Sequence, residues 1–303
     1  MVLPAFVWPV IVWRGNAKVL AQLLAVGGEV VHTHGATIPA RAPLARGGQG
    51  PGADSRMHSI TVLTYNLHKG MSPLGGRVRL PQMAAALQQL DADVLCLQEV
   101  QGRHQRRQLR HDGWPQHDYL AAALARQACY GMNARYDHGH HGNAVLARFP
   151  LAMAANHDLS VNRLEQRGLL HTVVQPPGWP QPLACLCGHF NLLAHDRRRQ
   201  YRVLLDYLAQ HVPPDMPLIL AGDFNDWRSE ADRHLLAEGG LQEAHASVHG
   251  RHARSFPSGL PLLPLDRIYI RGLHVAEVAV CRGAPWSALS DHLPVLARLQ
   301  LAA

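Results

Sequence analysis

The stretch that decides the fold is PLILAGDFNDW at residues 217–227, in which an apolar run leads directly into carboxylate and amide groups. The apolar run predicts a buried strand. Side chains alternate between the two faces of a strand, so Asp223 and Asn225 share a face while the chain stays extended. Such a pair could position a water molecule and a phosphoryl oxygen. The alternative is a simple turn, which Asp and Asn both favour.

Other predicted strands also carry polar groups at their ends. The run VLCLQEV at residues 94–100 ends near Glu99, where an unpaired buried charge would be costly and a cation would relieve it. Asp266 opens another strand, and Asp291 stands directly before His292. An aspartate that accepts a hydrogen bond from a histidine ring fixes its tautomer and raises its basicity, as a general base or a phosphate-stabilising imidazolium requires.

The pattern of apolar residues predicts an α/β fold. Helical periodicity covers residues 80–90, 119–129 and 196–212. Strand pairs without a helix between them, 143–149 with 153–160, 168–175 with 183–190 and 265–271 with 274–281, are expected to be antiparallel neighbours. Further strands are predicted at 59–66, 93–99, 217–224 and 294–301. We therefore expect two mixed β-sheets packed together and flanked by helices, a four-layer α/β sandwich.

Composition describes a globular chain with an anionic partner or substrate. Of 303 residues, 47% are hydrophobic and 17% are charged, which excludes a disordered or fibrous protein. Lysines and arginines number 29 against 22 acidic residues, and the net charge of +7 suits nucleic acid, lipid headgroups and small phosphates equally. Five scattered cysteines are too few for a disulfide framework and favour a reducing compartment.

The first 57 residues differ from the rest. Two apolar patches are separated by Arg14 and Lys18, and a run rich in Gly, Pro and Arg follows at residues 40–52. Neither patch approaches the roughly 18 apolar residues of a membrane span, and nothing basic precedes the first one as a signal peptide requires. We expect residues 1–57 to be a poorly ordered extension with Met57 as an alternative start, residues 58–303 to form one domain, and the location to be cytoplasmic.

Taken in order, these segments resemble the endonuclease/exonuclease/phosphatase superfamily, the DNase I-like metal-dependent phosphodiesterases. The resemblance covers residues 58–301 and is carried by TYNLH (64–68), QE (98–99), GNAVLARFP (142–150), GHF (188–190), GDFN (222–225), LDR (265–267) and SDH (290–292). The chain is similar in particular to a bacterial branch encoded beside cardiolipin synthases. That similarity is carried by NLHKG (66–70), HHGNAVL (140–146), and Phe256-Pro257 before Pro261-Leu262-Leu263.

The resemblance implies a metal site and a catalytic pair. The metal would be Mg²⁺, with Mn²⁺ able to substitute, because hard oxygen ligands suit both ions. Its expected ligands are Glu99, Asn66 and Asp291. Asp266 and His292 match the superfamily's Asp–His pair.

The resemblance also implies how substrate is handled. Asp223 and Asn225 match the pair that orients the attacking water and contacts the phosphate, and His189 matches a histidine at the scissile phosphate or leaving group. Arg167 and Asn143 are expected on the substrate side. The implied reaction is in-line attack of water on phosphorus. Either Asp223 or His292 could accept the water's proton.

The substrate is less sharply predicted than the chemistry. A nuclease-like phosphodiesterase acting on DNA or RNA is favoured, with a phospholipid or inositol-phosphate phosphodiesterase or phosphatase as the alternative and a decayed binding module as a further one. A nuclease should carry a basic groove with stacking platforms, whereas a lipid enzyme should carry an exposed apolar rim. His138, His140 and His141 are interpreted as a substrate-facing loop rather than a zinc site. We expect a monomer without an obligate protein partner.

Overall fold

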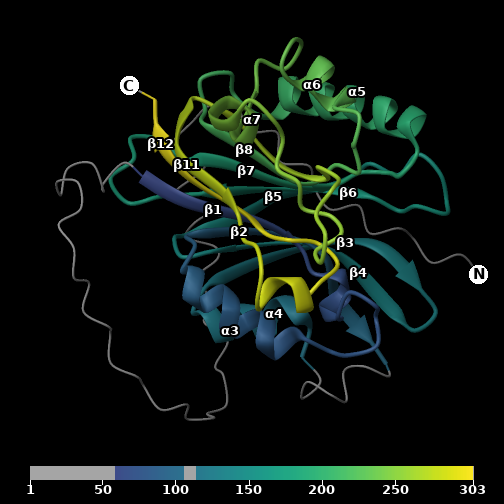
Figure 1. Ribbon diagram of the computed structural model, residues 1–303. Helices are drawn as coiled ribbons and strands as arrows, with labels where there is room; N and C mark the ends of the chain where they lie inside the picture. Colours follow the sequence, from purple (N-terminus) through teal and green to yellow (C-terminus); the bar gives the residue numbers. More distant parts are fainter. Residues whose placement is uncertain (1–58, 106–113, 303) are drawn as a thin grey trace, which may run out of the picture.

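A computed structural model describes residues 59–105 and 114–302, so the predicted extension at 1–57 lies outside the described residues. Two six-stranded mixed sheets pack face to face, and helices cover both outer faces (Figure 1). The predicted four-layer α/β sandwich is therefore confirmed. Within the described ranges, no helix is both long enough and apolar enough to cross a membrane.

The first sheet has the order β11-β12-β1-β2-β4-β3. Its strands are β1 (Ser59–Asn66), β2 (Val94–His104), β3 (Gln127–Tyr136), β4 (Gly139–Ala147), β11 (Leu273–Val280) and β12 (Val295–Leu301). Only β1 and β2 are parallel. The outer face is covered by α3 (Leu80–Leu90), α4 (Gln116–Leu124) and the short helix η3 (Trp286–Ala288).

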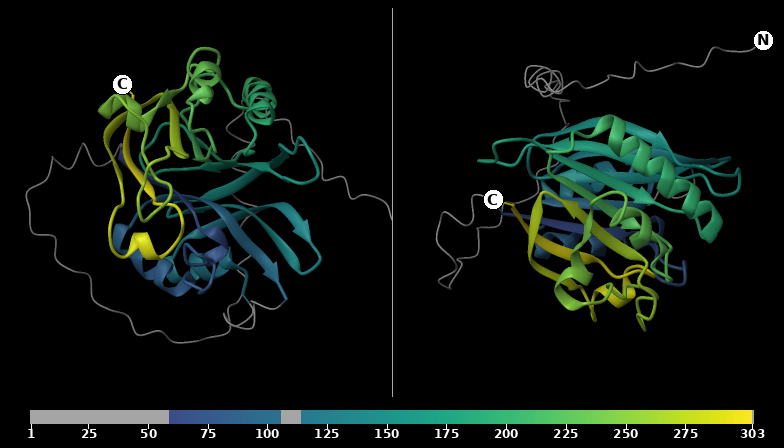
Figure 2. Two further views of the ribbon diagram at one scale, coloured as in Figure 1. Left: turned by 45° about the vertical axis from the view of Figure 1, so that its right-hand side comes forward. Right: turned by 90° about the horizontal axis from the view of Figure 1, so that it is seen from above.

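The second sheet has the order β5-β6-β7-β8-β10-β9. Its strands are β5 (Leu151–Asp158), β6 (Gly168–Val174), β7 (Leu183–His189), β8 (Leu218–Asp223), β9 (Gln242–Glu243) and β10 (Asp266–Arg271). Here β7 and β8 are the parallel pair. The helices α5 (Ala194–His211) and α6 (Glu230–Leu235) cover its outer face, while α7 (Ala244–His249) packs beside β10 and β11 (Figure 2).

Strand alternation divides the core into three apolar layers. In β1, Ile60 and Val62 face the second sheet, whereas Leu63 and Tyr65 face α3 and η3. The inner positions of β8 likewise join the layer between the sheets, and its other positions pack under α5. Burying both faces of each sheet explains why these strands are apolar almost throughout.

Three predicted features of the fold are wrong. The helix predicted at 119–129 ends at Leu124, because Ala125 adopts a left-handed backbone (φ 52°) and β3 begins two residues later. The pairs 143–149 with 153–160 and 265–271 with 274–281 do not form, since β4 and β10 lie in different sheets from β5 and β11. A short connection can cross between packed sheets as readily as it can close a hairpin. The pair β6–β7 is confirmed.

His252 anchors the segment that leads into β10. Its ring contacts two carboxylates, with Nε2 2.8 Å from Asp232 Oδ2 and Nδ1 3.1 Å from Glu243 Oε2. Burial opposes a charge on this ring, but the two hydrogen bonds raise the pKa of His252 to about 9. The ion pairs thereby join α6 and β9 to the chain entering the site.

Replacing this residue, His252→Gln, should lower the free energy of unfolding by roughly 2 kcal/mol below about pH 6. The pKa is raised in the folded state, so the contribution is complete below the unfolded value of about 6.5 and is lost as the pH rises through about 9. Denaturant titrations of both proteins across this range measure the difference. A difference that is independent of pH would show that the ring contributes only packing.

Candidate active site

The predicted site residues gather at one end of the space between the sheets. Asn66, His189 and Asp223 are the last residues of β1, β7 and β8, and Asp266 is the first residue of β10. All four are buried, and each continues the inner, core-facing positions of its strand. The register that pairs Asp266 with Asp223 sets the two carboxylates on neighbouring strands. Alternation therefore delivers polar groups where the apolar layer between the sheets ends.

Asp223 lies at the centre of this group. Its Oδ2 accepts a hydrogen bond from Asn66 Nδ2 at 3.0 Å, and its Oδ1 accepts one from the Asn225 backbone N–H at 3.0 Å. The Nε2 atoms of His189 and His292 lie 3.5 and 3.7 Å from Oδ2. Burial raises the pKa of Asp223 to about 6, although the charge of His292 opposes the shift. This carboxyl can therefore exchange a proton near neutral pH.

His292 forms the predicted pair with Asp266. Its Nδ1 lies 2.8 Å from Asp266 Oδ2, and the Phe256 ring packs against it with centroids 4.9 Å apart. Burial alone would favour the neutral ring, but the charges of Asp266 and Asp223 raise the pKa of His292 to about 10. The imidazolium donates one N–H to Asp266 and directs the other toward Asp223.

His189 has the opposite character. Burial and the nearby Arg167 guanidinium hold the pKa of His189 well below its ordinary value. Arg167 Nη1 lies 3.5 Å from Nδ1, and Asn225 Nδ2 lies 3.4 Å from Nε2 while donating to the Phe190 carbonyl at 3.0 Å. Asp223 is thus flanked by one cationic and one neutral imidazole. Two titratable groups whose surroundings give them very different pKa values are typical of acid–base sites.

A bulge turns Glu99 into the site. The register of β2 against β4 shifts between Leu97 and Val100, and Glu99 has a positive φ of 52°. This backbone region is unfavourable for a residue with a side chain, and bulges of this kind redirect side chains next to active sites. Burial disfavours the carboxylate, but the Lys69 ammonium, 2.9 Å from Oε2, holds the pKa of Glu99 well below its usual range.

The residues predicted to hold a metal fit a hard divalent cation. Glu99 and Asp291 supply carboxylate oxygens, and both side chains are partly accessible. Asn66 is connected to Asp291 through His68, the first residue of η1 (His68–Gly70). Asn66 Oδ1 accepts a hydrogen bond from the His68 backbone N–H at 3.0 Å, and His68 Nδ1 lies 3.6 Å from Asp291 Oδ1. Oxygen donors with open positions suit Mg²⁺ or Mn²⁺. The Lys69 ammonium neutralises Glu99 in the metal-free protein.

A second group, Asp223, Asp266 and His292, also places its ligand atoms within 4.8 Å of one another. In the metal-free protein the charges of Asp266 and Asp223 raise the pKa of His292, so the ring donates an N–H to Asp266. Without a metal, this group forms a hydrogen-bonded acid–base triad.

Asn143 differs from its predicted position on the substrate side. Its Nδ2 donates to the Gly168 carbonyl at 2.8 Å and the Cys187 carbonyl at 3.0 Å, so it joins the two sheets. Both amide hydrogens are used in this way, and a contact with a phosphate oxygen would have to replace one of these bonds. Its substrate contact stays a prediction.

Two further residues of the site, Lys69 and His141, were not among the predicted catalytic, metal-binding or substrate-binding residues. Burial, followed by the charge of Lys69, lowers the pKa of His141 to about 4, and Glu99 and Arg167 also act on this ring. His141 therefore lies on β4, toward the cation side of the site, rather than in the predicted substrate-facing loop. Both residues belong to motifs quoted above, NLHKG and HHGNAVL, but only the packing of η1 against β2 and the pairing of β2 with β4 bring them near Glu99.

Comparison with known proteins agrees with this geometry. The sequence model of the Endonuclease/Exonuclease/phosphatase family matches residues 63–292. The chain belongs to this family. It is 38% identical to YbhP of Escherichia coli K12, an uncharacterised protein, over 82% of this chain and 98% of YbhP. A UPF0294 protein of Vibrio cholerae is 38% identical over 37% of each chain.

Solved structures of the family share the fold. An endonuclease/exonuclease/phosphatase from Beutenbergia cavernae has a TM-score of 0.63 at 22% identity, covering 81% of this chain and 72% of its own. TDP2 of D. rerio, complexed with single-strand DNA product, has a TM-score of 0.61 at 18% identity, covering 80% and 99%. The human Nocturnin catalytic domain with bound sulfate has a TM-score of 0.62 at 17% identity, covering 81% and 94%.

The opposite characters of the two histidines can be measured directly. In metal-free protein, ¹⁵N NMR of the rings should show His292 protonated and His189 neutral at pH 7. Asp266→Asn should lower the pKa of His292, because the ring loses the charge that stabilises its cation, and should leave His189 neutral. A neutral His292 ring at pH 7 in the unmodified protein would contradict the assigned triad.

Proposed function

We propose that this protein hydrolyses phosphodiesters by in-line attack of water, assisted by a divalent cation. The observation that carries the proposal is the buried Asp223 carboxylate between a cationic and a neutral imidazole, beside a redirected glutamate with open coordination positions. Hydrolysis of a diester needs a proton acceptor for water and donors for the growing negative charge. This end of the sandwich supplies both.

Asp223 is suited to orient the attacking water and accept its proton. Its oxygens are fixed by Asn66 and the Asn225 backbone N–H, so the carboxylate cannot rotate away. A pKa near 6 leaves it mainly ionised at neutral pH while keeping proton transfer accessible. His292 is already protonated and therefore serves as a donor to the phosphoryl oxygens rather than as the base.

Arg167 and His189 form the opposite wall. The guanidinium is held by Glu165 at 3.3 Å and lies beside the neutral ring, which leaves it N–H groups for a phosphate oxygen. Glu99, Asn66 and Asp291 would hold the cation, which when bound offsets phosphoryl charge and polarises the ester oxygen. Lys69, which pairs with Glu99, and the neutral His141 ring would set the net charge next to that cation.

Two substrate classes fit this chemistry. A nucleic acid is the class favoured by the sequence, and His140, Tyr130 and Tyr136 beside Arg103 and Arg135 provide a surface near His141 on which bases could stack. A phospholipid diester is the alternative. Retention of Asn66, His189, Asp223, Asp266 and His292 in one buried cluster argues against a decayed binding module. We propose that the protein acts without an obligate protein partner.

Removing the charge of Glu99 tests the cation. Glu99→Gln should reduce turnover of bis(p-nitrophenyl) phosphate by weakening Mg²⁺ binding, because the amide keeps the shape and loses the charge. Excess Mg²⁺ should restore part of the rate, and calorimetry should show a weaker affinity. Glu277→Gln, an exposed position on β11, is the matched control and should change neither quantity. Wild-type Mg²⁺ affinity in Glu99→Gln would contradict the assignment.

Removing the charge of Asp223 tests the base. Asp223→Asn should lower kcat by roughly 10²- to 10⁴-fold, the usual range for a lost proton acceptor, with Mg²⁺ affinity nearly unchanged. Rate measurements at saturating metal, together with a thermal melt to verify folding, give the comparison. Retention of most of the activity would exclude Asp223 as the base.

A further inference from the structure

The mouth of the site is bordered by exposed apolar side chains, here called the apolar rim. Leu164 and Leu260 are 96% and 66% exposed, and the others are about one-third to one-half exposed. The apolar rim consists of Leu164, Leu192, Leu193, Trp227, Leu260, Leu262 and Leu263. It holds seven of the fourteen exposed large apolar side chains in the described parts of the chain, so these side chains are concentrated here rather than scattered.

Strand register places all parts of the apolar rim at the edge where the site opens. The parallel strands β7 and β8 end together, and they are followed by Leu192–Leu193 and Trp227. Because β6 and β10 run antiparallel to them, the chain enters both strands at this same edge, after Leu164 and after residues 260–263. The apolar rim therefore comes from four separate segments that leave or enter the second sheet at the edge where β8 ends in Asp223.

Unpaired cations accompany the apolar rim. Arg163 precedes Leu164, Arg228 follows Trp227, and Arg199 lies on the first turns of α5. All three are exposed, and their guanidinium groups have no hydrogen bond or ion pair with any described residue. The acidic groups nearby, Glu165 and Glu230, are already paired with Arg167 and Arg198. The edge consequently presents positive charge between its apolar side chains.

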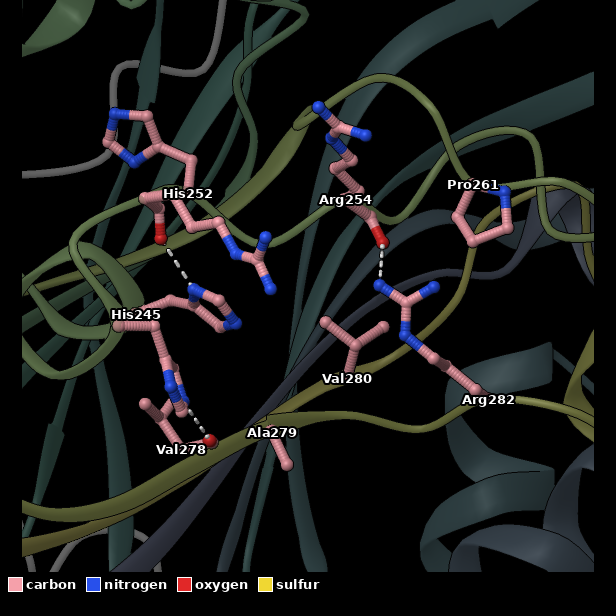
Figure 3. A pocket seen from close by; sticks show the side chains of 10 residues that line it. His245, His252, Arg254, Pro261, Val278, Ala279, Val280 and Arg282 are labelled. Carbon is pink, nitrogen blue, oxygen red and sulfur yellow. Dashed lines mark hydrogen bonds between the residues drawn. The ribbon is translucent and has the colours of Figure 1, made fainter.

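A basic pocket continues this surface behind residues 254–263 (Figure 3). It measures about 380 Å³ and is lined by Arg251, Arg254 and Arg282, by three histidines, and by Pro261 from the loop of the apolar rim. His245 uses Nδ1 on the Arg251 carbonyl at 2.6 Å, which leaves Nε2 available. No acidic side chain lines the pocket, which suits a phosphate-bearing headgroup.

We propose that the apolar rim docks on a membrane containing anionic phospholipids, so that the site reaches a lipid phosphodiester at the bilayer surface. The docking rests on the apolar rim and its arginines, and the choice of lipid as substrate rests on the proposed function. Apolar tips that enter the headgroup region, together with arginines that meet anionic lipids, are the two contributions that hold a protein at a bilayer.

The make-up of the apolar rim favours a bilayer over other occupants. Six of its seven members are leucines, which neither stack on bases nor bind phosphate, so a nucleic-acid strand would leave them exposed. The members also surround the mouth from several sides. A folded protein seated on them would close the site, whereas a bilayer can deliver its own lipid into it.

Vesicle co-sedimentation of the full chain tests the proposal, with EDTA present so that no turnover occurs. The protein should bind vesicles of phosphatidylglycerol and phosphatidylcholine at least several-fold more tightly than pure phosphatidylcholine. Leu192→Ser with Leu193→Ser, and separately Leu260→Ser with Leu262→Ser, should each weaken binding roughly tenfold or more, because apolar area no longer leaves water. Val203→Ser with Leu236→Ser, exposed positions outside the apolar rim, should leave binding unchanged.

A charge variant keeps the test independent of apolar substitutions. Arg163→Gln with Arg228→Gln should reduce binding to the anionic vesicles toward the level of pure phosphatidylcholine, and added salt should act in the same direction. Absence of binding to anionic vesicles, or equal losses in rim and control variants, would overturn the proposal. Rim variants that lose affinity for single-stranded DNA but not for vesicles would overturn it in favour of a nucleic-acid surface.

The docking proposal and the proposed hydrolysis can be disproved independently of each other. Hydrolysis of bis(p-nitrophenyl) phosphate with Mg²⁺ does not need a bilayer, so every rim variant should keep the wild-type rate, which also verifies folding. If no form hydrolyses this diester while the vesicle results hold, the proposed hydrolysis fails and the docking surface stands. If the diester is hydrolysed and vesicles are not bound, only the docking proposal fails.

Discussion

The site depends on one buried carboxylate. Asp223 is 1% exposed, and a charge removed from water in this way must be compensated by nearby donors. Asn66 supplies one donor from the opposite sheet, the Asn225 backbone supplies another, and His292 supplies opposite charge. His292 can hold that charge only because Asp266 lies beside it. The requirement to compensate Asp223 thus links both sheets at one end of the sandwich.

Much of this arrangement follows from the alternation of side chains between the two faces of each strand. The runs that lead to Asn66, Glu99, His189 and Asp223 are largely apolar, so both their strands and their polar ends could be predicted from the sequence. The bulge that turns Glu99 inward could not, since strict alternation would place it with Leu95 and Leu97 on the outer face. A register shift depends on the partner strand, and the sequence of one strand does not encode it.

Other features escaped prediction because they depend on contacts between distant parts of the chain. Ala125 ends α4 within an alanine-rich run whose propensity remains helical, and the next residues are drawn into β3 by pairing with β4. Lys69 and His141 are 72 positions apart and come together only because η1 packs against β2 and β2 pairs with β4. Asn143 was expected on the substrate side from the family resemblance, whereas two carbonyls of the other sheet accept hydrogen bonds from its amide.

The division between the site and its border has an energetic reason. Groups that stabilise a transition state must be desolvated and fixed, and the cluster around Asp223 meets both conditions through burial and mutual hydrogen bonds. Groups that recruit a large, mobile surface must instead remain accessible, at the cost of exposing apolar side chains to water. Because the loops of the apolar rim directly follow or precede the strands that carry the site, the proposed docking would hold a substrate over Asp223 without disturbing the buried network.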